Sequence, residues 1–403
     1  MKILIGPGKS KEVLSPFDNK WYTRGREYDV PFSVAIRMQA DPQFGVTIPY
    51  QSAPEYDASI WRDRKEVAMF AEIDPNSGWG NVGTNLIKYS PDINFAQVGK
   101  IWGVREPLVR TASHRAVNEG GGMVFHQQPK STWLLSPFGR NIAIVPFETT
   151  KVPYSWVERL NFMDAVFVPC LQNVEMMRDS GVTVPIEIVH WGVDTEKFYK
   201  LERQGNRPFT FGHMGMLSMR KGTDILVRAF QAAFPYEKDV RLICKTSDRN
   251  YPFMVFGEKR IVVQQGPMEH QDLMDKFFSE IDVFVFPTKG EGCGLTPLEA
   301  MATGVPAIVT GWSGPVEYMN EDAGWSLNYS MGKAKEFDVN VYGEDCGDWA
   351  IPDFDHLVYL MRYAYEHQDE VKQKGDYAAE YVKREWSWDA QIPLFHEALD
   401  KHL

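Results

Sequence analysis

The chain has 403 residues, more than one hydrophobic core normally organises, so two domains are expected. Its hydrophobic fraction of 44% is ordinary for a globular protein, and its formal net charge of −11 argues against nucleic-acid binding through bulk charge. The four cysteines contain no C-x-x-C pair, which fits a reducing cytosol better than a disulfide framework or a zinc site.

The N-terminal stretch MKILIGPGKSKEV has an apolar run that is too short for a signal peptide. No apolar run elsewhere approaches the ~20 residues that span a bilayer. We therefore expect a cytoplasmic protein, with peripheral contact with a membrane left open. Residues 1–64 mix proline, glycine, aromatic and charged residues with little periodicity, so they are either an elaboration of the first domain or a lid over its cleft.

A glycine-rich stretch, G-x-G-x-x-G at 78–83, follows a predicted buried strand at 67–73 and precedes a predicted helix at 84–87. This order is typical of a phosphate-binding loop, which would make Gly78 and Gly80 ligand contacts. Binding of NAD also requires an acidic residue at the end of the next strand, whereas the apolar run at 93–98 ends in glycine and lysine. NAD binding is therefore disfavoured, while a phosphate loop and an ordinary tight turn both stay open.

Two polar side chains follow further predicted strands of the first domain. His126 ends the strand that includes 123–125, where ligands bind in open α/β sheets, and a structural histidine fits this place equally well. Glu148 follows the strand at 141–147 and is interpreted as a solvated loop carboxylate, with a position lining the first-domain side of the cleft as the alternative. Further strands at 165–169 and 186–190 enclose a helix at 172–180.

A basic pair lies in the turn at 215–222, between a predicted strand at 209–214 and a predicted helix at 225–234. Arg220 and Lys221 suit a diphosphate, because an arginine fork binds it bidentately and a lysine adds a point charge. A solvated basic turn is the alternative.

The most informative stretch runs from 284 to 311 and reads strand, glycine-rich turn, helix, strand. Such a turn lies at the carboxyl end of a strand, where ligands bind. Its glycines let the backbone approach a ligand closely, and the N–H groups that open the helix favour an anion. Glu291 precedes the helix and Glu299 lies on it.

The sequence EGCGLTPLEAMATGVPAIVT resembles the E-x7-E signature of retaining glycosyltransferases of family 4, also called glycosyl transferases group 1, which have the two-domain GT-B fold. The resemblance implies that Glu291 binds hydroxyls of a donor sugar and that Glu299 binds the ribose. Cys293 stands where the family usually has an aromatic residue, which leaves the shape of the donor pocket open. The donor-binding residues implied in the second domain are Gly215, Arg220, Lys221, Gly292, Cys293, Gly294, Leu295, Thr296 and Glu299.

The same resemblance bears on three other places. Met216 stands where the family has its diphosphate-binding arginine, so Arg220 is expected to supply that charge beside Lys221. His126 matches a family histidine near the donor sugar, and Gly78 and Gly80 loosely resemble a loop that faces the donor phosphates.

We therefore predict an α/β protein of the GT-B fold, with two doubly wound Rossmann-like domains facing across a cleft. Residues 1–198 form the acceptor-side domain with its divergent segment 1–64, 199–207 the linker, 208–385 the nucleotide-sugar-binding domain, and 386–403 a helix that returns to the first domain. The D-x-D at 353–355 is interpreted as a helix cap, so no metal is predicted.

The predicted activity is retaining transfer of a sugar from a nucleotide-diphosphate donor, UDP- or GDP-linked, to a hydroxyl of a glycan, lipid-linked or small acceptor, with no cofactor required and no nucleic-acid partner. The alternatives are a nucleotide-sugar epimerase or phosphorylase of the same fold, an NAD-dependent oxidoreductase using Gly78–Gly83, and a non-catalytic sugar-binding protein.

Overall fold

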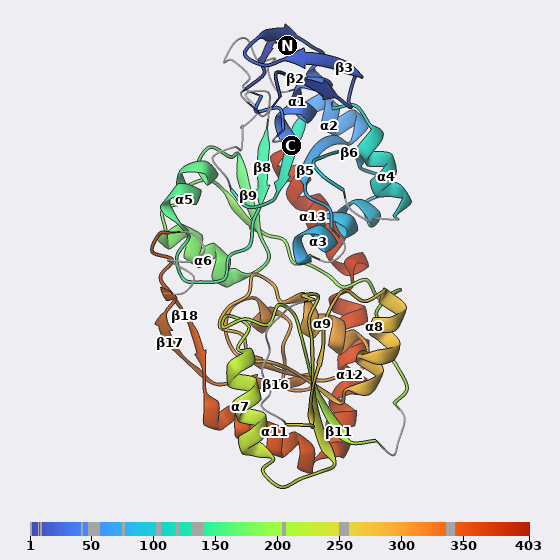
Figure 1. Cartoon of the computed structure of the whole chain (residues 1–403), viewed down its shortest axis with the longest axis vertical. Helices are drawn as coiled ribbons and strands as arrows, with labels where there is room; N and C mark the ends of the chain where they lie inside the picture. Colours follow the sequence, from blue (N-terminus) through green and yellow to red (C-terminus); the bar gives the residue numbers. More distant parts are fainter. Residues whose placement is uncertain are drawn as a thin grey trace.

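The computed structural model describes residues 2–6, 8, 10–41, 43–46, 57–74, 77–101, 106–117, 121–129, 140–203, 207–249, 258–335 and 343–403. These residues form two parallel six-stranded sheets, one above the other along the longest axis of the molecule, with helices around each (Figure 1).

The first sheet has the order β10-β9-β8-β7-β5-β6, and all of its pairs are parallel. Its strands are β5 (Glu66–Ala71), β6 (Asn94–Val98), β7 (Gly122–His126), β8 (Asn141–Ile144), β9 (Ala165–Val168) and β10 (Ile186–Ile188). Every residue of the three central strands β7, β8 and β9 is buried, as expected for a parallel sheet covered on both faces. The helices of this domain include α2 (Ala58–Arg64), α3 (Gly78–Lys88), α4 (Pro107–His114), α5 (Tyr154–Leu160) and α6 (Leu171–Asp179).

The second sheet has the order β13-β12-β11-β14-β15-β16 and is also parallel throughout. Its strands are β11 (Phe209–Met214), β12 (Val240–Lys245), β13 (Ile261–Gln264), β14 (Val283–Phe286), β15 (Ala307–Thr310) and β16 (Gly324–Leu327). Its helices include α7 (Thr223–Ala233), α8 (His270–Lys276), α9 (Leu295–Ala302), α11 (Phe354–Glu366) and α12 (Gln368–Glu385). The predicted pair of doubly wound α/β domains is confirmed.

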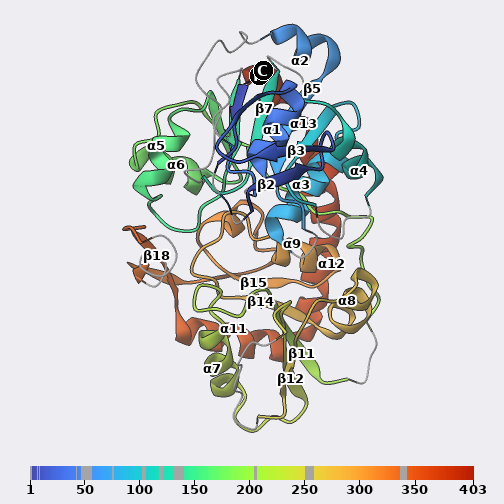
Figure 2. The ribbon, with the colours of Figure 1, turned by 45° about the horizontal axis from the view of Figure 1, so that its top comes forward.

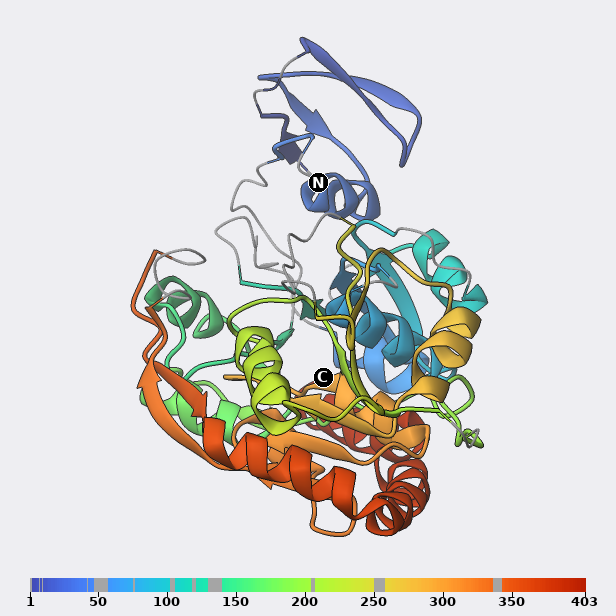
Figure 3. The same ribbon diagram turned by 60° about the horizontal axis from the view of Figure 1, so that its bottom comes forward.

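The described residues among the first 46 form a small unit with its own buried cluster around Ile3, Tyr22 and Phe44. β1 (Lys2–Leu4) pairs with β4 (Glu27–Asp29), β2 (Glu12–Ser15) pairs with β3 (Lys20–Thr23), and α1 (Phe32–Ala40) follows. Arg37 anchors this unit to the first domain by donating to the Gln97 carbonyl at 3.2 Å. Figures 1 and 3 show the unit projecting from the end of the molecule that lies away from the second sheet, so in its described residues it elaborates the first domain and is not a lid.

The last helix, α13 (Trp388–His402), packs back on the first domain (Figures 1 and 2). Its Asp400 accepts a hydrogen bond from Trp61 Nε1 at 2.9 Å, and Lys401 forms an ion pair with Glu187 at 2.6 Å. The chain thus crosses between the domains twice, once between β10 and β11 and once near Ser387, which pairs with Val193.

An unexpected hairpin also joins the domains. β17 (Tyr329–Lys333) and β18 (Asp348–Pro352) are antiparallel and extend from the second domain to α5 and α6 of the first (Figures 1 and 2). We call residues 329–352 the arm, of which 336–342 lie outside the described residues. Thr150 N donates to the Asp348 carbonyl at 2.9 Å, and Cys346 is buried within the core of the first domain.

Glu344 of the arm accepts hydrogen bonds at the N-terminus of α5, from Tyr154 N at 2.7 Å and from Ser155 Oγ at 2.6 Å. We expect Glu344→Ala to lower the free energy of unfolding by about 1 kcal/mol, because it removes the cap of this helix. Glu321→Ala, at an exposed residue outside the arm, is the control and should change it by less than about 0.5 kcal/mol. Urea denaturation of both variants measures the difference, and equal effects would show that the capping contact is not formed.

Candidate active site

The two domains meet where the carboxyl ends of their central strands point toward each other. The segment after β8 contacts the turn after β14 so closely that two glycines are required. A Cβ atom placed on Gly290 would lie 1.8 Å from the Glu148 carbonyl oxygen, and one placed on Gly292 would lie 2.2 Å from Pro146 Cβ. Side chains on these turns therefore face one another across the domain interface.

Glu291 is at the centre of a charged cluster at this interface. Its Oε1 atom accepts hydrogen bonds from Arg220 Nη1 at 2.8 Å, Lys221 Nζ at 2.8 Å and Thr288 Oγ1 at 2.9 Å. Its backbone N–H donates to Ser313 Oγ at 3.0 Å. Burial raises the pKa of Glu291, but the charges of Arg220 and Lys221 outweigh this, so its pKa is lowered and it is a carboxylate at neutral pH.

The basic turn after β11 is bonded directly to the turn that carries Glu291. Lys289 N donates to the Arg220 carbonyl at 2.7 Å, and Arg220 Nη1 donates to the Gly290 carbonyl at 2.6 Å. The Lys221 ammonium also lies 4.8 Å from the centroid of the Phe286 ring, and burial lowers its pKa. These contacts hold both cations toward the domain interface.

Met216, which stands where the resemblance expects an arginine, is 70% exposed and lies apart from these contacts. Arg220 therefore occupies the second cationic position beside Lys221. Gly215 lies against the lysine stem, since a Cβ atom placed on it would be 3.8 Å from Lys221 Cε.

The N-terminus of α9 lies next to Glu291. Gly294, with φ of +81°, turns the chain into the helix, and its carbonyl accepts a hydrogen bond from Tyr318 at 2.7 Å. Leu295 and Thr296 form the first turn. The Thr296 hydroxyl oxygen is buried and has no hydrogen-bond partner in the part of the chain that the structure describes. Free N–H groups and an unpaired hydroxyl at a helix N-terminus suit an anionic ligand.

Glu299 lies farther along α9 and is only 8% exposed. Among the described residues its carboxyl group has no ion pair or hydrogen bond, and burial raises its pKa to about 8. The group is therefore mostly protonated at pH 7. A buried, unpaired carboxyl group destabilises the folded protein, and such groups cluster at functional sites.

His126, at the end of β7, is buried beside the rings of Trp79 and Trp191. Its Nε2 atom lies 2.8 Å from the Trp79 carbonyl oxygen, and burial lowers its pKa to about 4, so the imidazole is neutral. Within the described residues no hydrogen bond or ion pair joins His126 to the cluster around Glu291.

The predicted turn at 78–83 is wrong, because α3 begins at Gly78. Ser77 caps this helix by accepting a hydrogen bond from Gly80 N at 2.9 Å. A Cβ atom placed on Gly80 would lie 2.2 Å from backbone atoms of Asp74, so this glycine is needed for close packing. The first turn of a helix replaces the open glycine-rich loop.

Cys293 is buried in the core that both domains share, and burial raises the pKa of its thiol.

Asp353 caps α11 by accepting a hydrogen bond from His356 N at 2.9 Å, as predicted for the D-x-D stretch.

Sequence reasoning missed two residues of this region. Thr288 and Ser313 hydrogen-bond to Glu291. Their only sequence signal is their position, since Thr288 directly precedes the glycine-rich turn and Ser313 begins the sequence S-G-P-V-E at 313–317. The interpretation of Glu148 as a solvated loop carboxylate is wrong, and the alternative position at the cleft fits better: its side chain is 23% exposed and its Oε1 atom lies 3.8 Å from Arg220 Nη2. Burial raises its pKa.

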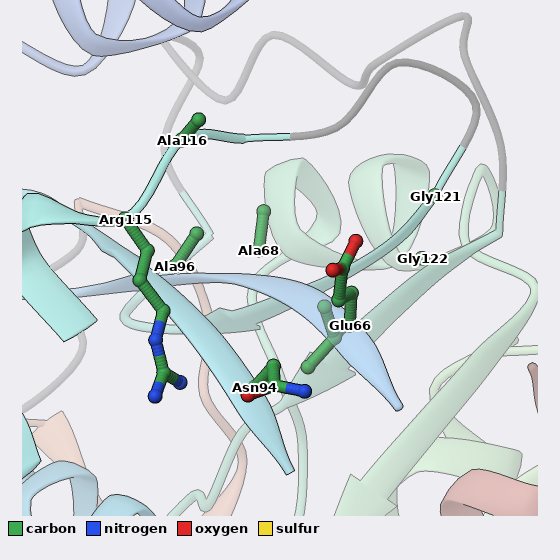
Figure 4. Close-up of a pocket in the computed structure, with 9 residues that line it drawn as sticks. Glu66, Ala68, Asn94, Ala96, Arg115, Ala116, Gly121 and Gly122 are labelled. Atoms are coloured by element: carbon green, nitrogen blue, oxygen red, sulfur yellow. The ribbon is translucent and has the colours of Figure 1, made fainter. Parts of the chain in front are cut away.

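A separate cavity of about 300 Å³ lies at the opposite, amino-terminal edge of the first sheet (Figure 4). Its lining includes Glu66, Asn94 and Gly122, the first residues of β5, β6 and β7. Figure 4 shows that the Arg115 and Glu66 side chains do not point toward one another, so the cavity offers no convergent charged site.

No helix among the described residues is both long and apolar enough to cross a membrane. In the same residues no group of three or more His, Cys, Asp or Glu side chains is arranged to hold a metal ion.

Two doubly wound domains that meet at their carboxyl edges, with a cationic pair and a helix N-terminus at the interface, define the GT-B class of fold. Sucrose-phosphate synthase from Thermosynechococcus elongatus shares it, with a TM-score of 0.62 and 14% identity over 84% of this chain and 99% of that chain. Anabaena Alr3699/HepE in complex with UDP and glucose gives a TM-score of 0.61 and 13% identity, over 83% and 99%.

Residues 208–337, within the second domain, match the family model described as Glycosyl transferases group 1. The lipopolysaccharide core biosynthesis mannosyltransferase LpsB of Rhizobium meliloti (strain 1021) is 34% identical over 145 residues, 32% of this chain and 41% of that protein. A GDP-mannose-dependent alpha-mannosyltransferase of Corynebacterium glutamicum is 24% identical over 203 residues, 46% of this chain and 45% of that protein. The chain therefore spans less than half the length of these curated relatives.

Proposed function

We propose that this protein is a glycosyltransferase that moves a sugar from a nucleotide-diphosphate donor to a hydroxyl group of an acceptor. The observation that carries the proposal is the buried Glu291 carboxylate, held by Arg220 and Lys221 beside the N-terminus of α9. The family match to residues 208–337 and the named mannosyltransferase relatives support it.

Each group of this cluster has a task that suits its chemistry. Arg220, Lys221 and the N–H groups of α9 stabilise the negative charge that builds on the departing diphosphate. Glu291 orients hydroxyl groups of the donor sugar. Glu299, as a protonated carboxyl group or as a carboxylate paired with a hydroxyl, binds the ribose. His126 and the helix start at Gly78 and Gly80 complete the donor side from the first domain.

We infer that transfer occurs with retention of the anomeric configuration. The bond from the anomeric carbon to the phosphate oxygen breaks, the acceptor oxygen bonds to that carbon on the same face, and the acceptor proton goes to the departing phosphate. This route needs no nucleophilic carboxylate, cofactor or metal. Since Gly290 contacts the Glu148 backbone, the domains must separate for substrates to enter and close again for transfer.

The donor is proposed to be a UDP- or GDP-sugar, as the HepE complex and the GDP-mannose-dependent relative suggest. The acceptor is proposed to be a glycan, free or lipid-linked, since LpsB acts in lipopolysaccharide core biosynthesis. The four cysteines are free and buried, which supports a cytoplasmic enzyme, and a lipid-linked acceptor would bring it to the membrane surface.

A thermal-shift screen with UDP, GDP, ADP, NAD and the sugar conjugates of the three nucleotides tests the proposal. We expect one nucleoside diphosphate to stabilise the protein by roughly 2.7 kcal/mol at about 100 times its dissociation constant. The matching nucleotide sugar should also be hydrolysed slowly when no acceptor is present. Stabilisation by NAD alone would favour an oxidoreductase, an epimeric nucleotide sugar as product would favour an epimerase, and binding without any turnover would favour a sugar-binding protein.

A further inference from the structure

Glu148 lies in a segment that α6 holds rigidly. The Asn173 side chain accepts a hydrogen bond from Phe147 N at 2.9 Å and donates one to the Phe147 carbonyl at 2.8 Å. Gln172 donates to the Thr149 carbonyl at 3.1 Å. The backbone is therefore fixed on both sides of Glu148, and a carboxyl group on such a support has a defined position.

The second domain holds the same segment from the other side. The Glu148 carbonyl packs against Gly290, and Thr150 N donates to the Asp348 carbonyl of the arm at 2.9 Å. Domain closure thus sets the position of the Glu148 side chain relative to the turn that carries Glu291.

The Glu148 side chain faces the proposed donor site, but contacts within that site do not use up its capacity to accept hydrogen bonds. The distance of 3.8 Å from Arg220 Nη2 is too long for a hydrogen bond, whereas Glu291 takes the shorter contacts of both cations. The charged groups that face Glu148 are Arg220, Lys221 and Glu291, all from the second domain. The carboxyl group therefore keeps capacity to accept hydrogen bonds at the place where the two domains meet.

We propose that Glu148 is the acceptor-binding residue of the transferase: its carboxylate accepts a hydrogen bond from the attacking hydroxyl group and directs the oxygen toward the anomeric carbon. This inference rests on the proposed function. The donor is held by the second domain, so the attacking group must approach from the first, where Glu148 stands. The transferred proton still ends on the departing phosphate, and Glu148 accepts the hydrogen bond without taking the proton.

A purely structural role would look different. If Glu148 served only to hold Arg220 in place, its loss would weaken nucleotide binding, because Arg220 would no longer be set for the diphosphate. If Glu148 positions the attacking group, its loss leaves nucleotide binding intact and slows the attack.

The test uses water as the acceptor, in the full-length protein. Hydrolysis of the nucleotide sugar that stabilises the wild type is compared in Glu148→Gln, Glu148→Asp and Glu175→Gln, the last at an exposed residue of α6. We expect Glu148→Gln to lower kcat by about 10²-fold, as misplacement of a reacting group does, with unchanged stabilisation by the nucleoside diphosphate. Glu148→Asp, which keeps the charge, should recover part of the rate, and Glu175→Gln should match the wild type.

Undiminished hydrolysis by Glu148→Gln overturns the inference and leaves the proposed function standing. Weakened stabilisation by the nucleoside diphosphate also overturns it, in favour of a structural role. A wild type that neither binds nor hydrolyses any nucleotide sugar refutes the proposed function itself, so the two failures are distinguishable.

Discussion

Replacement of Lys221 by methionine should lower kcat of sugar transfer by about 10²- to 10³-fold. This is the usual effect of removing one preorganised positive charge that stabilises an anion as it develops. Lys221 is buried against Glu291 and the Phe286 ring, so its ammonium is already in place before the diphosphate departs. Methionine keeps the length and most of the apolar contact of the lysine stem. Glu291 also keeps its hydrogen bonds from Arg220 and Thr288, so the fold should tolerate the change.

Release of nucleoside diphosphate from the nucleotide sugar measures this effect. The control is Lys276→Met, at an exposed lysine of α8 whose ion pair with Asp272 lies on the surface. It should leave kcat unchanged. Lys221→Met with near wild-type kcat, and with unaltered stabilisation by the nucleoside diphosphate, would place the phosphate site elsewhere in the molecule.

Replacement of Glu299 by glutamine should make the protein more stable while it weakens donor binding. In the folded protein the pKa of Glu299 is about 8, against 4.5 for the exposed group. The unfolded chain therefore releases a proton above pH 4.5 that the folded chain keeps. Wild-type stability is fully present below pH 4.5 and falls as the pH rises toward 8, and the neutral glutamine does not share this loss. The expected gain is on the order of 3 kcal/mol at pH 7.

Urea denaturation of the wild type and Glu299→Gln from pH 4 to pH 9 checks this expectation. The difference in free energy of unfolding should be small at pH 4, grow between pH 4.5 and 8, and then level off. Glu380→Gln, at an exposed residue of α12, should show no such growth. A constant difference across the pH range would mean that Glu299 titrates normally in the folded protein. If the nucleoside diphosphate stabilises Glu299→Gln less than it stabilises the wild type, Glu299 contributes to ligand binding, and this role explains why a destabilising buried carboxyl group is kept.

The sequence by itself determined the features that depend on short stretches of chain. Buried apolar runs between glycine-rich turns are enough to locate strands such as β11, β14 and β15, because a parallel strand covered on both faces is apolar throughout. The turns with Arg220, Lys221 and Glu291 follow those strands directly, so the sequence also placed them at one edge of one sheet.

The prediction for residues 78–83 failed because two local sequence signals, the glycines and the helix-capping Ser77, favour different structures. The glycines at 78–83 predicted a turn, yet the Ser77 cap starts α3 at Gly78, because the capping hydrogen bond and close packing on Asp74 offset the poor helix propensity of glycine.

Only the tertiary structure decided the features that join distant parts of the chain. The arm pairs the short, largely exposed strand β17 with the short, mostly buried strand β18 and then bonds to Thr150, almost 200 residues earlier, so no common periodicity marks it. The burial of Glu148 and Glu299 likewise depends on what packs over them. A carboxyl group in a loop or on a helix has the same sequence signal whether water or another domain covers it, and its pKa and role follow from that cover.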